Sequence, residues 1–321
     1  MPFSISSMDI DPERTTNEIV SWMLQIVRRK LNKKGVVIGI SGGIDSSVCL
    51  ALGVKAFGPD KVFAIAMPES ESNPDSTDLA RNLAEKYGIE FVVEDMTAAL
   101  SGLKAYQRRD EAIRSIFPEY DSTCKVKIVL PGDLLEKGTL NIFQLSIIAA
   151  DGSEKSKRIP LKEYLQIVAA SNFKQRSRMA MLYYHAERLN YAVIGTGNKN
   201  EHDQGFFVKY GDGGADVKPI AHLYKNQIYQ LGEYLDIPDE IRERIPTTDT
   251  YSAECTQEEF FFRVPFEIGD FVLFGLEENI PVSEIAGALS LKEEQVIRIQ
   301  NDIKQKIKTC EYLKAPPYHV K

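Results

Sequence analysis

Residues 36–50 read VVIGISGGIDSSVCL. The apolar run 36–40 passes directly into SGGIDSS, and apolar residues resume at Val48. A short apolar run that ends at glycines is typical of a buried strand, and the residues that follow are typical of a helix. The start of a helix carries unpaired backbone N–H groups, and glycine lets an anion approach them closely. The stretch therefore predicts a phosphate-binding loop between a strand and a helix.

The loop differs from the best-known phosphate loop. The Walker pattern GxxxxGK[ST] is absent, and Asp45 stands where its lysine would neutralise the phosphate. A carboxylate beside phosphates needs a cation between them, so the loop predicts Mg²⁺. Ser41, Ser46 and Ser47 add hydroxyl donors. The plainer alternative is an ordinary tight turn that a serine or aspartate caps.

Further strands and helices alternate after this loop, which predicts an α/β fold. Parallel neighbouring strands need helical crossovers, so the order indicates a doubly wound parallel sheet with flanking helices. A long helix and a fourth strand return to this sheet later in the chain, and a helical region with a break near 279–281 closes it. The expected strands are 36–40, 61–67, 89–94, 191–197 and a short one near 217–220, and the expected helices are 14–32, 45–57, 75–87, 172–190, 222–235 and 257–308.

One stretch has a different texture. Residues 125–161 show no helical period, and Pro-Gly, Lys-Gly and Asp-Gly turns separate short β-rich runs. We interpret 120–165 as a small β-rich insertion within a single domain, 1–321. It could cover the site, mediate assembly or have no catalytic role. As an excursion from the main sheet, residues 126–160 are expected to be replaceable by a linker without loss of folding.

The composition limits the class of protein. Hydrophobic residues make up 43% of the 321 residues and charged residues 26%, as in globular proteins. The net charge of −7 argues against a general nucleic-acid binder. The four cysteines are scattered, so neither a zinc ribbon nor a disulfide framework is indicated. No stretch predicts a membrane span or a signal peptide, and we expect a cytoplasmic protein.

A second stretch concentrates polar chemistry. Residues 195–216 read GTGNKNEHDQGFFVKYGDGGAD and hold six glycines in 22 residues. They follow the expected fourth strand, and ligands of such sheets bind at the carboxyl ends of strands. Packing does not require this composition, which therefore favours a binding loop over a plain solvated one.

These stretches carry a family resemblance. SGGIDSS resembles the pyrophosphate loop of the ATP pyrophosphatases, the adenine nucleotide alpha-hydrolase-like superfamily. The pattern GTGNKNE…KYGDGGAD…PIAHLYK resembles NAD⁺ synthetase, as do NFKQRSRM (172–179) and PTTD (246–249) in the same order. Gln175 stands where alanine is usual. Three further departures are a C-terminal tail with fewer basic residues, the β-rich insertion at about 120–165, which is not part of the family pattern, and the acidic stretch 69–71, where the family often has arginine. The last puts one ATP phosphate contact in doubt.

The resemblance implies an AMP-forming carbon–nitrogen ligase of NAD⁺ biosynthesis. ATP would adenylate the nicotinate carboxylate of deamido-NAD⁺ and release pyrophosphate, and ammonia would then displace AMP. The family forms homodimers with deamido-NAD⁺ near the subunit interface. No amidase signature appears around any of the four cysteines, so free ammonia is the expected nitrogen donor unless a separate glutaminase subunit docks.

The resemblance also implies roles for residues. As metal ligands it implies Asp45 and Glu201, and as catalytic groups Asp45, Lys225 and Thr196. Arg176 and Arg178 lie two apart on a helix, so only one is expected to face the nucleotide. The implied ATP and pyrophosphate contacts are Gly39, Ile40, Ser41, Gly42, Gly43, Ile44, Asp45, Ser46, Ser47, Arg176, Thr196, Lys225 and Thr247, and the implied deamido-NAD⁺ contacts are Lys209, Tyr210, Asp212, Asp216, Asn172 and Arg178.

Other readings remain open. A GMP synthetase-like amidotransferase would share SGGIDSS but would not explain KYGDGGAD. A tRNA-modifying thiolase would need active cysteines and a basic surface. A non-catalytic nucleotide sensor is the alternative outside the enzymes, and the presence of both Asp45 and Glu201 speaks against it.

Overall fold

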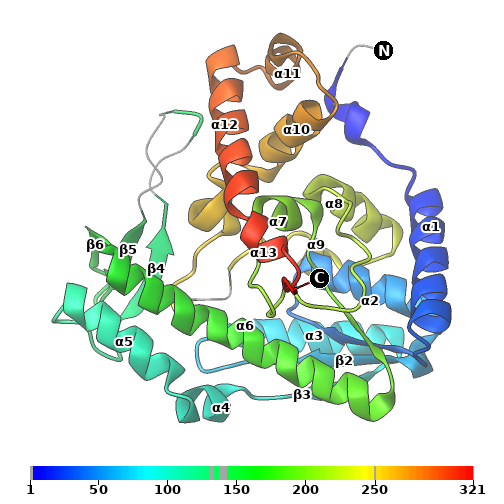
Figure 1. Ribbon diagram of the computed structural model, residues 1–321, viewed down its shortest axis with the longest axis horizontal. Coiled ribbons are helices and arrows are strands. Elements are labelled where there is room, and N and C mark those ends of the chain that lie inside the picture. Colours follow the sequence, from blue (N-terminus) through cyan, green and yellow to red (C-terminus); the bar gives the residue numbers. More distant parts are fainter. Residues whose placement is uncertain (1–2, 131–133, 137–142, 249–250, 321) are drawn as a thin grey trace.

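A four-stranded parallel sheet lies at the centre of the molecule (Figure 1). The computed structural model describes residues 3–130, 134–136, 143–248 and 251–320. The strand order is β3-β2-β1-β7, which confirms the predicted doubly wound α/β class. The order reverses beside β1, and such a switch point opens a crevice at the carboxyl ends of the strands. The sheet strands are β1 (Val36–Gly39), β2 (Val62–Ala66), β3 (Glu90–Val93) and β7 (Ala192–Ile194).

The two faces of the sheet are covered by different helices. Val36 and Ile38 point to one face, where they join a core with the helices α1, α2, α3 and α8. Val37 points to the other face and packs with Met179 and Leu182 of α6. Because successive strand side chains alternate in direction, a run that is apolar at every position must be buried on both faces. The helices of this layered body are α1 (Pro12–Leu24) with its extension η2 (Gln25–Lys30), α2 (Ile44–Phe57), η3 (Pro59–Lys61), α3 (Pro74–Tyr87), α6 (Leu161–Leu189), α7 (Lys199–Gln204), α8 (Lys225–Tyr234) and α9 (Asp239–Arg242).

Three expectations about elements need correction. The helix expected over 172–190 is α6, which begins at Leu161 directly after Pro160 and is 29 residues long. Residues 217–220 form no strand, and only one bridge joins Val217 to Ile194. The helix expected from 222 begins at Lys225. Two helices over 97–116 were not expected, namely α4 (Thr97–Gly102) and α5 (Ala105–Ile116).

The β-rich stretch forms a separate antiparallel sheet of order β4-β5-β6. Its buried side chains, among them Val126 and Leu145, share a hydrophobic cluster with Ile113 of α5, Ile167 of α6 and Tyr251. The outer edge of β4 also meets a distant segment, since the Ala253 N–H donates to the Val126 carbonyl at 3.0 Å. The antiparallel sheet is thus packed onto the main body, more closely than the sequence analysis expected of an excursion from the main sheet. Its strands are β4 (Lys125–Val129), β5 (Gln144–Ile148) and β6 (Glu154–Arg158), and residues 131–133 and 137–142 of the predicted insertion lie outside the described part.

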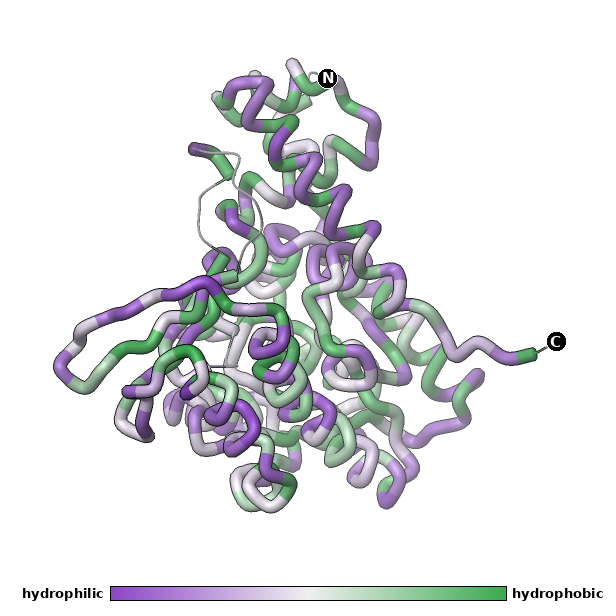
Figure 2. The backbone as a smooth tube through the Cα atoms, turned by 60° about the vertical axis from the view of Figure 1, so that its left-hand side comes forward, coloured by the Kyte–Doolittle hydropathy of each residue, from purple (hydrophilic) through white to green (hydrophobic). Residues whose placement is uncertain are grey.

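A helical layer stands above the sheet body, next to the N-terminal segment (Figures 1 and 2). Phe271 and Val296 belong to its own hydrophobic cluster, which also takes in Tyr224 at the start of α8. The break expected near 279–281 separates α10 from α11. Among the described residues, no helix has both the length and the apolar character needed to cross a membrane. The remaining elements are η1 (Ile5–Met8), η4 (Glu258–Phe262), α10 (Phe266–Glu277), α11 (Val282–Leu289), α12 (Glu293–Thr309) and α13 (Glu311–Lys314).

Candidate active site

The loop between β1 and α2 has the shape that its sequence predicts. Gly42 has a φ of +73°, and a Cβ there would lie 2.9 Å from the carbonyl oxygen of Ser76, so glycine is required on both counts. The Ser46 and Ser47 hydroxyls donate to the Gly43 carbonyl at 3.0 and 2.9 Å and hold the first turn of α2. Ser41 is exposed at the mouth of the loop. The other predicted members, Gly39, Ile40 and Ile44, form the strand end and the helix start.

Asp45 meets Lys225 across this crevice. The Lys225 ammonium, with a side chain 1% exposed, pairs with Oδ2 of Asp45 although the residues lie 180 apart in the chain. Burial by itself would lower the pKa of Lys225, but the carboxylates of Asp45 and Glu201 raise it above its ordinary value. The lysine is therefore a fixed cation between the start of α2 and the start of α8.

Glu201 is brought to the same place by a residue that the sequence analysis did not select. Asn198 caps α7, where its Oδ1 accepts from the Glu201 N–H at 3.0 Å and its own N–H donates to Oε2 of Glu201 at 3.2 Å. Its Nδ2 also donates to Oδ1 of Asp45 at 3.2 Å. Burial and the nearby Asp45 raise the pKa of Glu201. The spacing N-x-x-E is a capping-box signal that could have pointed to Asn198.

Gln257 contacts Glu201, and the two predicted threonines lie in nearby segments of the chain. Gln257 donates from Nε2 to Oε1 of Glu201 at 3.5 Å. Thr196 lies just beyond the end of β7, and Thr247 is exposed in a bridge with Thr256. Asp249, the last residue of PTTD, lies outside the described residues. The predicted metal and catalytic residues Asp45, Glu201 and Lys225 thus lie together, while no contact of the threonines with them is described.

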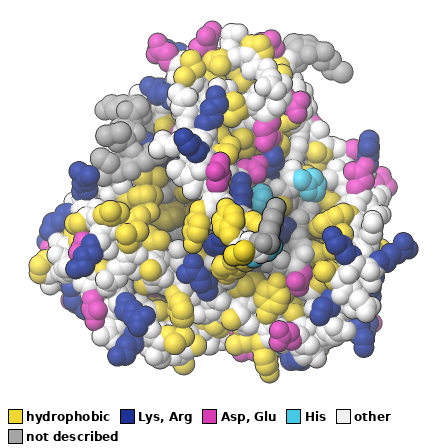
Figure 3. Space-filling view, in the orientation of Figure 1, with side chains coloured by type: hydrophobic (Ala, Val, Ile, Leu, Met, Phe, Trp, Pro, Cys, Tyr) yellow, Lys and Arg dark blue, Asp and Glu magenta, His cyan; other side chains and the backbone are white. Residues whose placement is uncertain are grey.

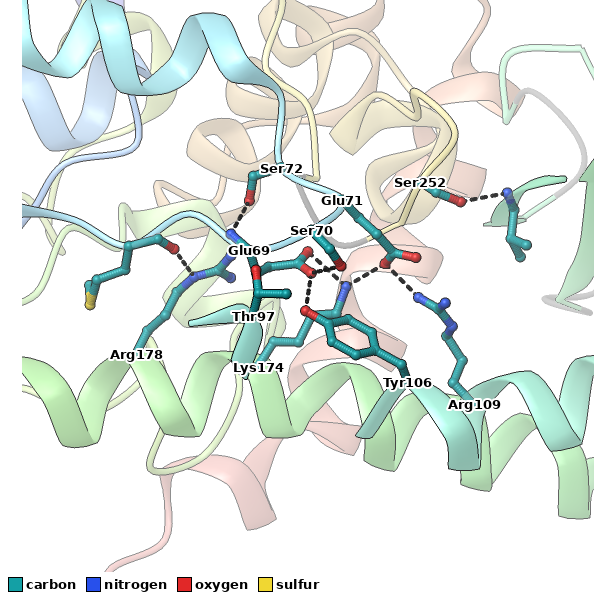
Figure 4. Close-up of polar contacts among 12 residues, drawn as sticks. Glu69, Ser70, Glu71, Ser72, Thr97, Tyr106, Arg109, Lys174, Arg178 and Ser252 are labelled. Carbon is teal, nitrogen blue, oxygen red and sulfur yellow. Dashed lines mark hydrogen bonds and ion pairs between the residues drawn. The ribbon is translucent and has the colours of Figure 1, made fainter. Parts of the chain in front are cut away.

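The acidic stretch after β2 is neutralised by buried bases (Figure 4). The Lys174 ammonium pairs with Oε1 of Glu69 at 2.9 Å and Oε2 of Glu71 at 2.6 Å, and Arg109 pairs with Glu71 from α5. Tyr106 donates its hydroxyl to Oε2 of Glu69 at 2.6 Å. Burial alone would raise the pKa of Glu71, but Lys174 and Arg109 lower it below its ordinary value. The two glutamates therefore serve to hold the loop between β2 and α3 in place.

The two arginines of α6 point to different loops, as their spacing predicts. Arg178 donates from Nε to the Met67 carbonyl at 3.0 Å, next to the acidic stretch (Figure 4). Arg176 is exposed and donates to the Lys209 carbonyl at 3.1 Å. Asn172 lies earlier on the same helix and is half-buried. Neither arginine approaches the Asp45–Lys225 pair through a described contact.

A cavity of about 570 Å³ lies between α6, the glycine-rich loop and the C-terminal tail. Arg176, Lys209 and Tyr210 line it together with Lys218 and the tail residues Leu313–Pro317. Hydrophobic side chains gather in the middle of this face (Figure 3). Lys209 donates to the carbonyls of Tyr312 and Ala315 at 2.9 and 2.8 Å, so it fastens the tail across the cavity.

The two aspartates of GDGGAD are engaged within the chain. Asp212 accepts from the Val208 N–H at 2.8 Å and shapes the glycine-rich loop. Asp216 accepts from the Val193 N–H at 2.8 Å and from the Tyr183 hydroxyl at 3.2 Å, which ties the loop to β7 and α6. Both residues remain exposed to solvent on one side. Their described contacts are those of loop supports.

The arrangement suits the binding of a nucleotide phosphate with a cation. It combines a glycine loop, a helix start, one buried lysine and two carboxylates. When both are ionised, Asp45 and Glu201 carry two negative charges against the single charge of Lys225, so a bound phosphate would be repelled without a further cation. Within the described residues, no cluster of three or more His, Cys, Asp or Glu side chains could hold a metal alone. A site of this kind acts by positioning and by charge stabilisation rather than through a protein nucleophile.

Comparison with known proteins identifies relatives over nearly the whole chain. The sequence model of the family described as NAD synthase matches residues 15–118 and 135–315. A protein of Rhizobium meliloti (strain 1021) named NH(3)-dependent NAD(+) synthetase is 49% identical over 315 residues, which cover 98% of this chain and 94% of that protein. A protein of Rhizobium rhizogenes (strain K84 / ATCC BAA-868) with the same name is 47% identical over 314 residues, with the same coverage.

A solved structure supports the fold. The NH3-dependent NAD synthetase of Campylobacter jejuni subsp. jejuni NCTC 11168, solved in complex with the nitrate ion, superposes with a TM-score of 0.61. The alignment covers 97% of this chain and all of that chain, at 22% identity. The family model resumes at residue 135. The expectation that the whole of 120–165 departs from the family pattern is therefore wrong, because only 120–134 of that stretch is unmatched.

Proposed function

Because this chain belongs to the NAD synthase family, we infer that it uses ATP to amidate deamido-NAD⁺ to NAD⁺, with ammonia as the nitrogen donor and AMP and pyrophosphate as the other products. The observation that carries this function is the meeting of Asp45, Lys225 and Glu201 at the phosphate loop. A GMP synthetase-like enzyme, a thiolase or a nucleotide sensor is not favoured by these relatives.

The reaction needs two displacements. A carboxylate oxygen of the nicotinate attacks the α-phosphorus of ATP, and the bond to pyrophosphate breaks. Ammonia then attacks the carbonyl carbon of the mixed anhydride, loses a proton, and AMP leaves. We assign the pyrophosphate to the loop 39–47 and to Lys225, whose charge offsets the charge that develops on the leaving group. Arg176, Thr196 and Thr247 remain proposed ATP contacts.

We propose that Asp45 and Glu201 hold Mg²⁺. Oxygen donors are the ligands that Mg²⁺ prefers, and it is usually bound through one or two carboxylates together with substrate phosphates. The side chains present fit this pattern, since Asn198 holds both carboxyl groups at one place and Lys225 supplies only one positive charge to balance them when they are ionised. When bound there, Mg²⁺ would neutralise phosphate charge and orient the phosphates.

We propose the lined cavity as the binding region for the deamido-NAD⁺ end. Lys209 and Tyr210 line it, as does Arg176, and Lys218 adds a further cation. Asp212, Asp216, Asn172 and Arg178 lie on the loop and helix that frame it. The apolar side chains that α6 leaves exposed, Leu161, Leu165 and Tyr184, support a homodimer in solution, which light scattering tests. The four unpaired cysteines support a cytoplasmic location.

The test is a reaction with a strict substrate requirement. The purified chain is incubated with ATP, Mg²⁺, ammonium chloride and deamido-NAD⁺, and AMP, pyrophosphate and NAD⁺ are measured. We expect the three products in equal amounts, with none of them formed when deamido-NAD⁺ is omitted. Nicotinic acid mononucleotide replaces deamido-NAD⁺ in a parallel reaction. Faster turnover of the mononucleotide, or release of AMP and pyrophosphate from ATP alone, would contradict the proposed substrate.

A further inference from the structure

Asp270 is a fully buried carboxylate of α10 that belongs to none of the residues discussed above. Its Oδ1 accepts a hydrogen bond from Nδ2 of Asn200, and its Oδ2 accepts from the backbone N–H of Asn226 at 2.7 Å. Asn200 lies in the first turn of α7, and Asn226 lies in the first turn of α8. One side chain thus joins the beginnings of two short helices that come from different parts of the chain.

The two partners are immediate neighbours of site residues. Asn200 precedes Glu201, and Asn226 follows Lys225. The far end of α10 repeats the connection, because Glu277 pairs with Lys199 at 2.8 Å and accepts from the hydroxyl of Tyr224. Two side chains of α10 therefore each contact the starts of both α7 and α8. In addition, the Lys225 ammonium lies 5.6 Å from the ring centre of Phe266 at the beginning of α10.

Short helices need such support. α7 has six residues and α8 has ten, so neither is rigid through its own hydrogen bonds. A buried polar group that loses its hydrogen-bond partner costs free energy. The hydrogen bonds from Asn200 and Asn226 to Asp270 therefore keep the starts of α7 and α8 in one arrangement. The sheet fixes β1 and the loop that carries Asp45, but Glu201 and Lys225 depend on where α7 and α8 begin.

We propose that Asp270 is a positioning residue that sets Glu201 and Lys225 against Asp45 from the helical layer. The inference rests on the proposed roles of those three residues. A displacement of about 1 Å of a catalytic group can reduce turnover about 100-fold. The effect of losing Asp270 should fall on kcat, because the loop 39–47 that grips ATP makes no described contact with Asp270.

Two variants of Asp270 separate its chemistry from its volume. Asp270→Ala removes both acceptors, and we expect kcat to fall about 30- to 100-fold while KM for ATP stays within about threefold. Asp270→Asn keeps an oxygen for the Asn226 N–H. Its new amide can donate to Oδ1 of Asn200, a buried atom that has no hydrogen-bond partner among the described residues. We expect Asp270→Asn to retain kcat within about fivefold.

A matched control is available in the same layer. Asp302 of α12 is a buried acid that forms ion pairs with Arg263 and Lys306, neither of which belongs to α7 or α8. Both Asp302→Ala and Asp270→Ala should lower the melting temperature, but the kcat of folded Asp302→Ala should stay within about twofold of wild type. If Asp270→Ala keeps kcat, or if Asp302→Ala loses as much, the positioning role is overturned.

A second readout does not depend on turnover. In the protein without substrates, amide hydrogen exchange at 199–204 and 224–228 should be faster in Asp270→Ala than in wild type and near normal in Asp270→Asn. Unchanged exchange in Asp270→Ala would refute the proposal. A wild-type chain that makes no NAD⁺ would refute the proposed function instead and leave the exchange result to decide on Asp270. Should Asp270→Ala not fold, Asn200→Ala removes the α7 contact alone, and an unchanged kcat there would also overturn the role.

Discussion

Asp45 and Lys225 form the centre of the site, and their pairing is set by tertiary structure. The lysine is almost inaccessible to solvent, and Asp45 retains one oxygen for Asn198. A buried cation of this kind has little freedom to move, so it can stabilise developing negative charge without reorganising. Glu201 stands at the same place with an amide partner on Gln257. The consequence is a site whose charges are arranged before ATP arrives.

The first prediction concerns the two carboxylates. Asp45→Asn and Glu201→Gln each remove one proposed Mg²⁺ ligand with little change in shape, and we expect adenylation to slow about 100- to 1,000-fold. The measurement is deamido-NAD⁺-dependent exchange between ATP and labelled pyrophosphate at saturating Mg²⁺. Asp75→Asn, at an exposed acid in the first turn of α3, serves as the control and should retain the wild-type rate. Near-normal exchange in both site variants would remove the metal assignment.

The second prediction concerns the buried ion cluster of the loop after β2. Lys174→Met leaves Glu69 and Glu71 without their main cation, and the free energy of unfolding should fall by about 3–5 kcal/mol. Adding Glu69→Gln to that variant should recover part of the loss, because one buried charge is removed. Urea denaturation measures the free energy of unfolding of the single and the double variant.

Lys155→Met is the matched control for this cluster. It breaks an exposed pair with Glu119, whose side chains are 62% and 46% exposed, and such pairs contribute about 0–1 kcal/mol. Equal losses in Lys174→Met and Lys155→Met would show that the cluster adds no stability beyond that of a surface pair.

At the scale of elements, α6 connects the parts of the molecule. Its first half packs Ile167 against the antiparallel sheet, and its second half covers one face of the parallel sheet with Met179 and Leu182. Between these halves, Lys174 and Arg178 lie one turn apart and hold the loop after β2. Because one helix serves both regions, the antiparallel sheet is coupled to the active-site side of the molecule.

The third prediction concerns that antiparallel sheet. Replacing residues 126–160 with a short linker uncovers Tyr251 and Ile167 and removes the partners of 252–263. We expect a chain that still folds its parallel sheet but melts at a lower temperature, since none of the described residues of 126–160 belongs to the cores on the two faces of that sheet. Limited proteolysis should cut it within 251–263.

Removal of the exposed turn residues 150–152 is the control for this replacement, and it should change neither the melting temperature nor the proteolytic cleavage pattern. Global unfolding of the 126–160 replacement would mean that the sheet is part of the main core. An unchanged melting temperature and cleavage pattern would mean that it is an independent excursion, as the sequence alone suggests.

At the scale of the whole molecule, the burial of the cysteines bears on the source of the nitrogen. Of the four cysteines, Cys49, Cys255 and Cys310 are buried. Burial raises the pKa of Cys49 and of Cys255, in the latter case to about 12, so neither is poised as a thiolate nucleophile. The parallel sheet, the antiparallel sheet at one side and the helical layer above them form one continuous body (Figure 1).

The fourth prediction is about the nitrogen donor. The pure chain should form NAD⁺ with ammonium chloride and should form less than about a hundredth as much with glutamine that has been freed of ammonia. The pH dependence of the ammonium reaction provides an internal check, because the unprotonated amine attacks and the apparent KM for total ammonium should fall as pH rises. Glutamine that supports turnover as well as ammonium would reveal an amidase site in this chain.

Local sequence determined the parts of the protein that depend on neighbours in the chain. The alternation of buried strands and helices predicts the parallel sheet, since a two-sided apolar strand can be satisfied only between layers. The glycines of SGGIDSS predict the phosphate loop because Gly42 needs a positive φ and close contact. The spacing of Arg176 and Arg178 predicts that they diverge, and each reaches a different loop.

Tertiary structure alone decided which distant groups meet. Asp45 pairs with Lys225 from 180 residues away, and Asp270 reaches back 70 residues to Asn200, and neither distance leaves a local pattern. The acidic stretch 69–71 puts one ATP phosphate contact in doubt from the sequence, and only the structure shows that Glu69 and Glu71 pair with Lys174 and Arg109. The physical reason is that backbone propensity and hydrophobic period act over a few residues, whereas the partner of a buried charge is chosen by the packing of the whole chain.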